Sequence, residues 1–519
     1  MADSRHSVFR QFAASDWDGF LKGVEKEGLR VDRNGFIAQT PHPEALGAAL
    51  THPCITTDYS ESLLELITPV YSSTQDMLNC LTNTHRFVQS NLGDEVFWAA
   101  SMPCALDGDE SIPIARYGSS NIGQLKHVYR QGLAVRYGRI MQSIAGAHYN
   151  LSLPDSFWTR WQEALGSEQN LQDFKSEQYF WLIRNFRRRS WLLMLLFGTS
   201  PALDASFVAR VQHGLKPLDS QTWYGPEATS LRMSDLGYHN NAQGSLNICF
   251  NQLESYTGTL ARAIHTPWPA YEAIGTRRDG QFIQINTNVL QIENEYYSPI
   301  RPKRTTLPEE KPIHALVNRG VEYIEVRCLD LDPFSPVGIT ASQIDFLDLF
   351  LLDCLLSDSP HIGDEECERL DDNYGDVVAH GRNRNLQLNR DGGRTDIATL
   401  ADDLLQRMEP LADLLDSWTG ATTYRSALAE QLGKLQAGDG WQVPSERVLE
   451  SMASRSQGHR EWVLDMSLQH QENLRRDSLS EDKLASFRAM AEKSLADQKQ
   501  LEEADTQPFS EFLEEYLKS

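Results

Sequence analysis

Two short acidic stretches near the start of the sequence constrain the fold most, because they put carboxylates where β-strands would bring them together. In VEKEGLR, residues 24–30, Glu25 and Glu27 lie two positions apart, so an extended strand presents both on one face. Like charges that point together repel, and one carboxylate would be pushed towards protonation unless a cation lay between them. Carboxylate oxygens are hard ligands that suit Mg²⁺ or Mn²⁺. The first hypothesis is therefore a metal site.

The second stretch, TTDYSESLLELITP at residues 56–69, sets further acids among aliphatic residues. Asp58 and Glu65 are an odd number of positions apart, so a turn or bulge must separate them if both serve one site. Glu61 and Glu65 could instead share a helical face. For any single carboxylate a solvated charged face is the commoner explanation, by roughly two to one. The number of acids among aliphatic side chains favours a site.

Two later segments predict strands that carry polar side chains. Residues 321–329 alternate clearly, with Glu325 and Arg327 side by side on one face and apolar side chains on the other. A further strand face is predicted for Ile144, Gly146, His148 and Asn150.

The rest of the chain mixes strand and helix patterns. Residues 23–39 predict a hairpin around an Asn-Gly pair, and residues 281–290 alternate like a strand. We expect helices over residues 41–50, 74–92, 118–138, 155–213, 341–357, 396–417 and 443–470, followed by a charged helical tail. The sequence contains no internal repeat and no low-complexity segment.

Composition narrows the class of protein. The net charge of −24 argues against a nucleic-acid binder, because the chain as a whole does not attract phosphate. Seven dispersed cysteines without a C-x-x-C pair indicate neither a disulfide framework nor a zinc site. The start of the chain lacks the apolar core of a signal peptide, and the apolar run at residues 191–197 is too short to span a bilayer. We expect a reduced, cytoplasmic protein that binds neither nucleic acid nor membrane.

Common nucleotide-binding and hydrolase signatures are missing, including G-x-x-x-x-G-K-[ST], G-x-G-x-x-G, H-E-x-x-H and G-x-S-x-G. A nucleotide would therefore have to be bound through metals and basic side chains. The candidate cations are Arg130, Arg301, Lys303, Arg304 and Arg327. A lone histidine such as His148 is more often a core residue than a ligand, by roughly three to one. The carboxylates on neighbouring predicted strands shift those odds towards a ligand.

Six segments occur in an order that resembles the glutamate–cysteine ligases of the gamma-proteobacterial type. They are VEKEGLRV, ALTHPCITTDYSESLLELITPV, ARYGSSNIGQLKHVYRQGLAVRYGRIMQSIAGAHYNLS, SLRMSDLGYHN, ENEYYSPIRPKR and VEYIEVRCLDLDPFSP. The resemblance runs through the first two-thirds of the chain, and the remainder is similar in length and helical character. It implies an α+β fold, with a curved, mainly antiparallel sheet of the glutamine-synthetase type and surrounding helices. We expect a catalytic domain at residues 1–375 and a helical C-terminal region at residues 376–519 packed on it.

The resemblance implies ATP-dependent joining of the γ-carboxylate of L-glutamate to the amine of L-cysteine through γ-glutamyl phosphate. The products would be γ-glutamylcysteine, ADP and phosphate, in the first step of glutathione biosynthesis. Mg²⁺, with Mn²⁺ as a substitute, would be the cofactor, and glutathione would act as a feedback inhibitor. The sequence does not fix the oligomeric state, for which a monomer is one option.

The resemblance also implies roles for individual residues. The magnesium ligands would be Glu25, Glu27, Asp58, Glu65, His148 and Glu325. Arg130 and Arg327 would assist at the acyl-phosphate oxygens, and Asp58 is also a candidate base for the amine. The cysteine pocket would be formed by Tyr59, Tyr129, Gln142, Arg232, Tyr238 and Tyr297. The ATP phosphates would meet Arg301, Lys303 and Arg304.

Two other functions stay open. A carboxylate–amine ligase on the same scaffold could accept a different amine, and changes at Tyr59, Tyr238 and Tyr297 would be its signature. A catalytically inactive regulator that binds metal or nucleotide would lack one of the matched carboxylates. All of these residues are present, which favours the ligase that uses cysteine.

Overall fold

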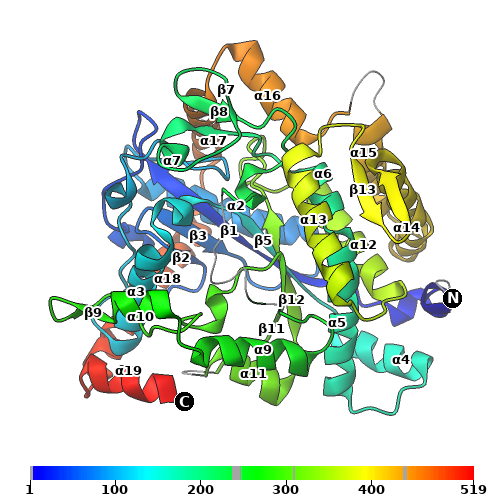
Figure 1. Ribbon diagram of the computed structural model, residues 1–519, viewed down its shortest axis with the longest axis horizontal. Coiled ribbons are helices and arrows are strands. Elements are labelled where there is room, and N and C mark those ends of the chain that lie inside the picture. The colour runs from blue at the N-terminus through cyan, green and yellow to red at the C-terminus, as the bar shows by residue number, and fades with distance from the viewer. Residues whose placement is uncertain (1–3, 237–245, 247, 308–309, 437–440, 519) are drawn as a thin grey trace.

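An antiparallel sheet lies at the centre of the computed structural model, which describes residues 4–236, 246, 248–307, 310–436 and 441–518 (Figure 1). Among these residues seven strands form the sheet in the order β11–β12–β5–β1–β3–β2, with β4 paired to β1. Their bounds are β1 Leu21–Val31, β2 Ile55–Thr57, β3 Leu63–Ile67, β4 Val96–Phe97, β5 Ala147–Ser152, β11 Ile300–Lys303 and β12 Tyr323–Leu329. Helices surround this sheet, so the predicted α+β class is confirmed.

The strand register brings the predicted acids onto one face of the sheet. Glu27 of β1 lies opposite Glu65 of β3, and Glu25 of β1 lies opposite His148 of β5. Directly opposed residues of an antiparallel pair point to the same side. β12 pairs with β5 on its other edge and adds Glu325 to this face. Glu65 belongs to a strand, so the alternative in which it shares a helical face is wrong.

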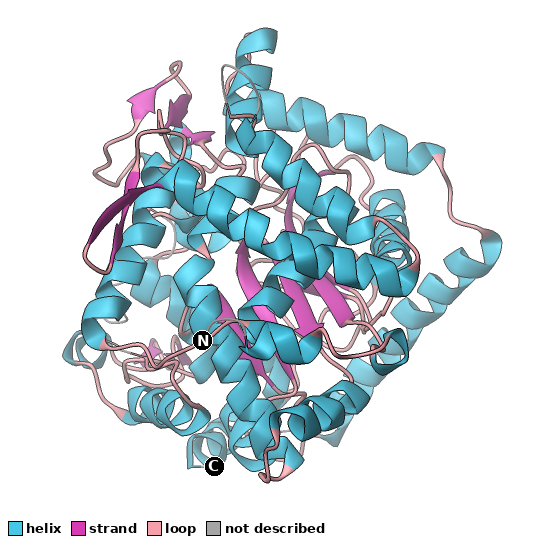
Figure 2. Cartoon of the chain, turned by 90° about the vertical axis from the view of Figure 1, so that its right-hand side faces the viewer, coloured by secondary structure: helices cyan, strands magenta, loops and turns pink. Residues whose placement is uncertain are grey.

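The opposite face of the sheet is largely apolar and packs on helices. It carries buried side chains such as Val24, Leu64, Leu66, Tyr149 and Val326. The contacting helices include α2 (Thr74–Asn91), α5 (Leu171–Arg189), α6 (Trp191–Phe197) and α12 (Ala341–Leu356). Figure 2 shows the sheet behind a layer of helices. The sheet thus has one apolar, covered face and one face that carries the acids.

The helices predicted over residues 74–92, 118–138, 341–357 and 396–417 are confirmed. Residues 443–470 contain one helix and part of a second, and residues 155–213 contain four helices and a short strand, so helix was wrong for the strand. Besides those given above, the main helices are α1 Ser4–Phe9, α3 Asn121–Tyr137, α4 Asp155–Leu165, α7 Ala205–Val208, α9 Leu253–His265, α10 Pro269–Ile274, α11 Pro312–Arg319, α13 Asp364–His380, α14 Ile397–Thr419, α15 Thr423–Gln436, α16 Pro444–Arg455, α17 His459–Arg476, α18 Glu481–Ala504 and α19 Phe509–Lys518. Smaller strands are β6 Ala202–Asp204, β7 Lys216–Pro217, β8 Thr222–Tyr224, β9 Arg277–Arg278, β10 Gln281–Phe282, β13 Gln387–Arg390 and β14 Gly393–Asp396.

Two other predictions of local structure were wrong, and a third is confirmed in part. The helix expected over residues 41–50 is only a single 3₁₀ turn, η2, at Glu44–Leu46. Of residues 281–290 only Gln281–Phe282 forms a strand. The hairpin expected over residues 23–39 is confirmed at its turn, because Ile37 pairs antiparallel with Val31, but the returning side makes only isolated bridges and no second strand.

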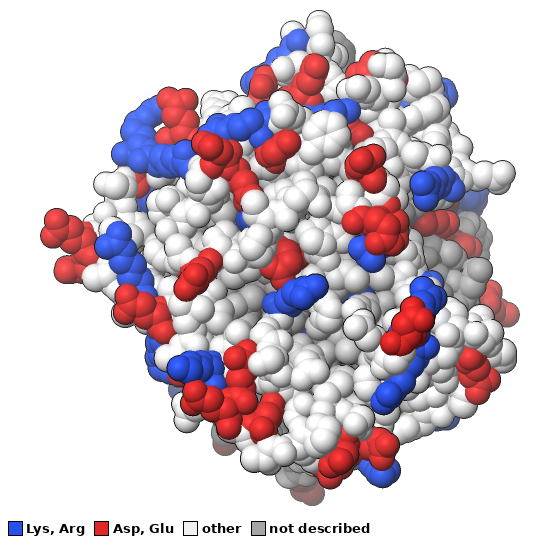
Figure 3. Space-filling model, turned by 90° about the vertical axis from the view of Figure 1, so that its left-hand side faces the viewer, with Lys and Arg blue, Asp and Glu red and all other residues white. Residues whose placement is uncertain are grey.

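Helices from the C-terminal part of the chain cover several surfaces of the rest. α14 and α15 pack on α12, while α17 and α18 pack on α2. The division of the chain at residue 375 stays a prediction. No helix among the described residues has the length and apolar character needed to cross a membrane. On the face shown in Figure 3 acidic and basic side chains are interspersed. The net charge of −24 is therefore not concentrated in one acidic patch on that face.

Asp353 joins four helices at one buried point. Its carboxylate on α12 lies 2.5 Å from Arg189 of α5, 2.9 Å from His6 of α1 and 2.8 Å from Arg407 of α14. Burial alone would raise the pKa of Asp353, but Arg189, His6 and Arg407 outweigh burial and bring the pKa well below its ordinary value. A depressed carboxyl pKa stabilises the fold above the unfolded-state pKa of about 4, and this contribution is lost as the pH falls below it.

We therefore expect Asp353→Asn to lower the free energy of unfolding by about 3 kcal/mol at pH 7. The difference from the wild type should narrow as the pH falls below about 4. Urea unfolding over a pH series measures both effects. Asp413→Asn, at an exposed pair with Arg425, is the control and should change little at any pH. A difference that stays constant with pH would contradict the charge-based explanation.

Candidate active site

Carboxylates from three strands, β1, β3 and β12, surround His148 of β5 on the acidic face of the sheet. One ligand atom each from Glu25, Glu65 and His148 lies within 4.8 Å of the others. His148 Nδ1 is 3.5 Å from a carboxylate oxygen of Glu25 and of Glu325. Its Nε2 is 3.6 Å from Glu27. Five of the six residues predicted as metal ligands therefore meet around one imidazole.

Asp58, the sixth predicted ligand, comes from the turn between β2 and β3. Its N–H donates to the carbonyl of Leu63 at 3.0 Å and closes this turn. The turn absorbs the odd spacing between Asp58 and Glu65, so both can face the same side. The negative charge of Asp58 is close enough to Glu65 to contribute to the raised pKa of Glu65.

Crowding and burial oppose ionisation of the acids on this face. Burial, and then the charges of Glu25 and Asp58, raise the pKa of Glu65 well above its ordinary value. Burial likewise raises the pKa of Glu27. Burial also acts to raise the pKa of Glu25, but the neighbouring His148 outweighs it and the net shift is downward. The cluster therefore carries repulsion that a bound cation would relieve.

The donor set fits a hard divalent cation. His148 Nδ1 is buried and makes no hydrogen bond with the described residues. Buried polar atoms without partners are rare and call for an explanation such as an ion. Several carboxylate oxygens with one imidazole form a set that suits Mg²⁺ or Mn²⁺ better than a soft metal.

Glu325 and Arg327 lie side by side on β12, as the alternation predicted. The carboxylate of Glu325 is 1% exposed and lies 2.8 Å from Arg327 NH1. Burial would raise the pKa of Glu325, but Arg327 and Lys303 bring it well below its ordinary value. Burial in turn lowers the pKa of Arg327, and Glu325 outweighs burial so that the pKa is raised. Both groups are therefore charged at neutral pH.

A first pocket, of about 810 Å³, opens beside this cluster. Nine predicted site residues line it: Glu27, Asp58, Tyr59, Tyr129, Arg130, Gln142, Tyr297, Arg301 and Arg327. Arg130 is fixed at its edge, because its Nε donates to the carbonyl of Asp58 and its guanidinium lies 4.7 Å from the ring centroid of Tyr117. The pocket thus combines aromatic walls with three guanidinium groups.

Five lining residues were missed from the sequence: Leu133, Tyr137, Met141, Asn294 and Glu295. Leu133 and Tyr137 follow Arg130 by three and seven positions on α3, so helical spacing from Arg130 could have found them. Asn294 and Glu295 come from a distant 3₁₀ turn, η6, at Glu293–Glu295. No local pattern in the sequence links that turn to α3.

A second pocket, of about 900 Å³, lies next to the first. Its walls come from α9, η6, β11, α11 and β12, and its lining residues are Tyr256, Leu260, Glu293, Asn294, Arg301, Pro302, Lys303, Arg304, Thr305, Thr306, Pro312, Ile313, Leu316 and Tyr323. Asn294 and Arg301 line both pockets. Lys303 Nζ is 3.4 Å from Glu325, which joins this pocket to the acid cluster.

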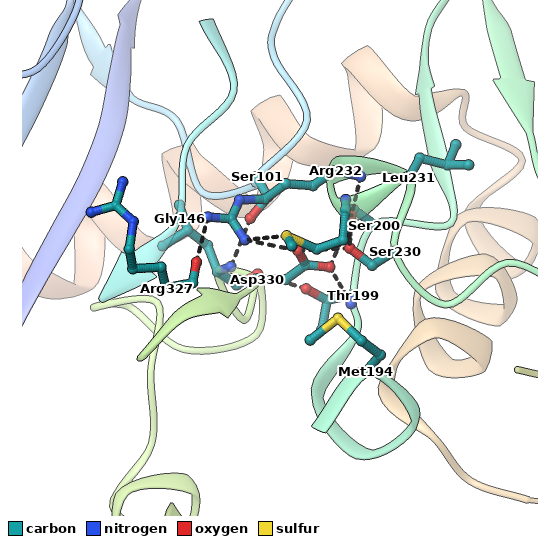
Figure 4. Close-up of polar contacts among 12 residues, drawn as sticks. Ser101, Gly146, Met194, Thr199, Ser200, Ser230, Leu231, Arg232, Arg327 and Asp330 are labelled. Atoms are coloured by element: carbon teal, nitrogen blue, oxygen red, sulfur yellow. Dashed lines mark hydrogen bonds and ion pairs between the residues drawn. The ribbon is translucent and has the colours of Figure 1, made fainter. Parts of the chain in front are cut away.

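Arg232 is buried behind the first pocket and does not line it. Figure 4 shows it between Asp330 and the backbone of Arg327, whose own side chain points away. Arg232 NH2 donates to the carbonyl of Arg327 at 3.0 Å, and NH1 is 3.8 Å from Asp330. A Cβ on Gly146 would lie 2.1 Å from this guanidinium, so only glycine allows the approach. Tyr238, also predicted for the cysteine pocket, lies outside the described residues.

Asp330 was missed from the sequence and anchors this buried arginine. Its carboxylate accepts hydrogen bonds from the N–H of Thr199 at 2.9 Å, Ser200 Oγ at 2.6 Å and Ser230 Oγ at 3.0 Å. These donors satisfy a carboxylate that is 2% exposed, and burial raises the pKa of Asp330.

Comparisons with known proteins agree on one family. The sequence model described as glutamate–cysteine ligase matches residues 7–377. The curated glutamate–cysteine ligase of Hahella chejuensis is 54% identical to this chain, over 96% of this chain and 95% of that protein. The one of Azotobacter vinelandii is 53% identical, over 96% of this chain and 94% of that protein. A crystal structure of glutamate–cysteine ligase from Francisella tularensis in complex with AMP has a TM-score of 0.90 at 36% identity, covering 96% of this chain and 98% of that one. The chain therefore belongs to the glutamate–cysteine ligase family.

Proposed function

We propose that the chain joins the γ-carboxylate of L-glutamate to the amine of L-cysteine, using ATP and passing through γ-glutamyl phosphate. The products are γ-glutamylcysteine, ADP and phosphate, in the first step of glutathione biosynthesis. The observation that carries this proposal is the adjacency of two pockets, which share Asn294 and Arg301 beside a cluster of carboxylates. A transfer between a nucleotide and an amino acid needs such neighbouring sites.

The second pocket would take ATP. Tyr256, Leu260 and Leu316 offer an apolar and aromatic lining for the base. Arg301 and Lys303 lie on its side towards the first pocket, where they would meet the phosphates. Arg304 also lines this pocket, but its NH1 donates to the carbonyl of Arg319 at 2.8 Å, so it would act at the rim.

The first pocket would take the two amino acids. Tyr59, Tyr129 and Tyr297 form aromatic walls that suit a small thiol-bearing side chain. Tyr59 is fully buried, and its hydroxyl has no hydrogen-bond partner among the described residues, so it is available to a substrate. Gln142 supplies an amide to the same wall. Arg232 would act from behind, through the backbone of Arg327.

The acid cluster would bind the divalent cation. Its ligands would come from Glu25, Glu27, Asp58, Glu65, His148 and Glu325. When bound, Mg²⁺ or Mn²⁺ neutralises charge on the ATP phosphates and polarises them. His148 and Glu325 are buried at 4% and 1% exposure, which fixes the geometry of the cluster before substrate arrives.

The chemistry needs positive charge at the acyl phosphate and a proton acceptor at the amine. A γ-carboxylate oxygen of glutamate attacks the γ-phosphorus of ATP, and ADP leaves. The amine of cysteine then attacks the acyl carbon, and phosphate leaves with the electrons of the C–O bond. Arg130 and Arg327 would stabilise the charge on the acyl phosphate, since both line the first pocket. Asp58, at the edge of the same pocket, is the candidate base for the amine proton.

Further properties follow from the proposed chemistry. Glutathione contains the product dipeptide and would compete for the first pocket as a feedback inhibitor. The antiparallel sheet with acids on one face supports the likeness to glutamine synthetase. We further propose a cytoplasmic monomer in which residues 376–519 form a helical region packed on the catalytic domain.

The deciding experiment measures ADP release by the purified protein with ATP, Mg²⁺ and glutamate, with and without cysteine. Release that depends on cysteine, with γ-glutamylcysteine identified as the product, is the expected result. Release with another amine in place of cysteine would keep the mechanism and change the substrate. No release with any amine tested would overturn the proposal in favour of a non-catalytic regulator.

Lys303→Met is expected to raise the KM for ATP about 10- to 100-fold, because one charge-assisted contact to phosphate is lost. The KM for cysteine should change less than the KM for ATP, since Lys303 lines only the second pocket. Initial rates over an ATP series measure the effect. Lys175→Met is the matched control, because Lys175 pairs with Asp155 outside both pockets. Equal KM values for ATP in both variants would remove Lys303 from the phosphate site.

A further inference from the structure

The last two described helices reach back to the helix that forms one wall of the first pocket. α3 contributes Tyr129, Arg130 and Tyr137 to that pocket. α19 contacts α3 and lies close to it in Figure 1. None of the described residues that line either pocket comes from residues 502–518. Any effect of this segment on the pockets must therefore pass through its neighbours.

Polar contacts tie the start of α3 to the connection between α18 and α19. The carboxylate of Asp505 accepts from the N–H of Asn121, the first residue of α3. The side-chain amide of Asn121 donates to the carbonyl of Gln507 at 3.1 Å. Glu502 accepts from the N–H of Ser119 at 2.8 Å. Carboxylates at a helix N-terminus accept hydrogen bonds from the free N–H groups there and interact favourably with the positive end of the helix dipole.

An apolar cluster joins the rest of α19 to the outer face of α3. Leu513, 3% exposed, packs with Leu125 and Val128 of α3 and with Ile285. Tyr129 packs against the same cluster while also lining the first pocket. The cluster is separate from the main core of the protein, so α19 supplies a small core of its own for α3.

Further along the same face, α3 packs against the segment that carries Glu295. A Cβ on Gly132 would lie 2.0 Å from the side chain of Gln291, so α3 and this segment meet at a glycine. Gln291 also donates to the carbonyl of Tyr129 at 3.1 Å. Arg136 pairs with Glu295 at 3.0 Å, with both side chains fully buried. One face of α3 thus packs on α19 near its start and on the residues around Gln291 further along, and Ile285 links the two contacts.

We propose that residues 502–518, here called the C-terminal strap, are a positioning element of the first pocket. The strap packs on one face of α3 beside the segment around Gln291, and together they set where Tyr129 and Arg130 lie. This inference rests on the proposed function of the first pocket as the amino-acid site. Its effect should appear mainly in the amino-acid KM, because α19 packs on α3, which lines the first pocket. The strap contacts the wall of the ATP pocket at the start of α11, where Lys311 Nζ lies 4.9 Å from the ring centroid of Tyr516.

The test compares two truncations of buried side chains at similar depth. Leu513→Ala weakens the contact of the strap with α3. Phe487→Ala is the matched control: Phe487 of α18 is 7% exposed and stacks on Phe87 of α2 at 4.9 Å, away from the first pocket. Both variants should lower Tm by a few degrees. Only Leu513→Ala should raise the KM for cysteine or glutamate, by about tenfold, with the KM for ATP nearly unchanged.

Asp505→Ala provides a second variant, which truncates no buried apolar side chain. Asp505 is exposed and its loss should leave the protein folded, while it removes the carboxylate at the start of α3. We expect the same direction of change in the amino-acid KM, smaller than for Leu513→Ala. Hydrogen exchange of residues 121–137 should quicken in both strap variants and stay at the wild-type rate in Phe487→Ala.

Two failures are distinguishable. If the wild type releases ADP with cysteine but Leu513→Ala and Asp505→Ala keep the wild-type amino-acid KM, the strap proposal is overturned and the segment only stabilises the fold. If the wild type itself shows no amine-dependent ADP release, the proposed function fails, and with it the amino-acid site that the strap is inferred to position.

Discussion

Glu65→Gln is expected to cut ADP release by about a thousandfold or more, and at the same time to raise the Tm of the metal-free protein. Glu65 lies directly opposite Glu27 and within reach of Glu25 and His148. Burial and the neighbouring carboxylates raise its pKa, so its charge opposes folding when no cation is present. Removing that charge relieves the repulsion, whereas a bound cation loses a ligand.

The two effects separate a metal ligand from a merely buried acid. Tm is measured in EDTA and over a Mg²⁺ series, and ADP release is measured in parallel. For Glu65→Gln the Tm in EDTA should rise, and the Mg²⁺-induced increase in Tm should shrink. Near-normal turnover, or an unchanged response of Tm to Mg²⁺, would remove Glu65 from the metal site.

Glu61→Gln is the matched control from the same acidic stretch. Its carboxylate accepts from the backbone N–H groups of His42 at 2.6 Å and Arg116 at 2.5 Å, so its charge is already stabilised. The substitution should lower Tm equally with and without Mg²⁺. The two glutamates thus differ in the structure in a way that their shared sequence stretch does not reveal.

The acid face could be predicted because strand geometry is local. The two-residue spacing of Glu25 and Glu27 fixes their common face whatever strand lies beside them. The odd spacing of Asp58 and Glu65 predicted a turn, and the structure has one at residues 58–63. The pairing of Glu25 with His148, by contrast, depends on which strands meet, and it came from the family resemblance.

The alternation of residues 281–290 misled because a strand also needs a partner. Beyond Gln281–Phe282 the described residues pair with this segment only through an isolated bridge between Asn288 and Pro267, and side-chain amides satisfy some of its backbone groups. Gln291 accepts from the N–H of Ile285 at 3.0 Å, and Asn286 accepts from the N–H of Asn288. Asn and Gln can satisfy a backbone in this way, so their presence in an alternating segment weakens a strand prediction.

The second prediction with a large effect concerns the buried ion pair between Lys22 and Asp348, which joins the sheet to the helices behind it. Lys22→Met is expected to lower the free energy of unfolding by about 3–5 kcal/mol, because it leaves Asp348 buried without its cation. Lys22 of β1 is 3% exposed; its ammonium contacts the carboxylate of Asp348 on α12 and donates to Thr74 of α2 at 2.9 Å. The same carboxylate accepts from Tyr149 of β5. This pair therefore joins two strands of the site to two helices.

The decrease in the free energy of unfolding of Lys22→Met should depend on pH. Burial raises the pKa of Asp348 to about 6 even with Lys22 present, and removal of Lys22 raises it further. A carboxyl whose folded pKa exceeds its unfolded value costs stability as the pH rises through that range, since the folded state binds more protons. Lys22→Met should therefore be least destabilising near pH 5 and most destabilising near pH 8, as urea unfolding at each pH would measure.

A second substitution tests whether the unpaired charge is the cause. Lys22→Met combined with Asp348→Asn should recover much of the lost stability and flatten the pH dependence, because no buried charge remains. Arg476→Met, at an exposed pair with Glu472 on α17, should change the free energy of unfolding by no more than about 0.5 kcal/mol. If the double variant is as unstable as Lys22→Met at pH 8, lost packing of the lysine stem explains the effect. In that case the ion pair is not what secures β1 to α12.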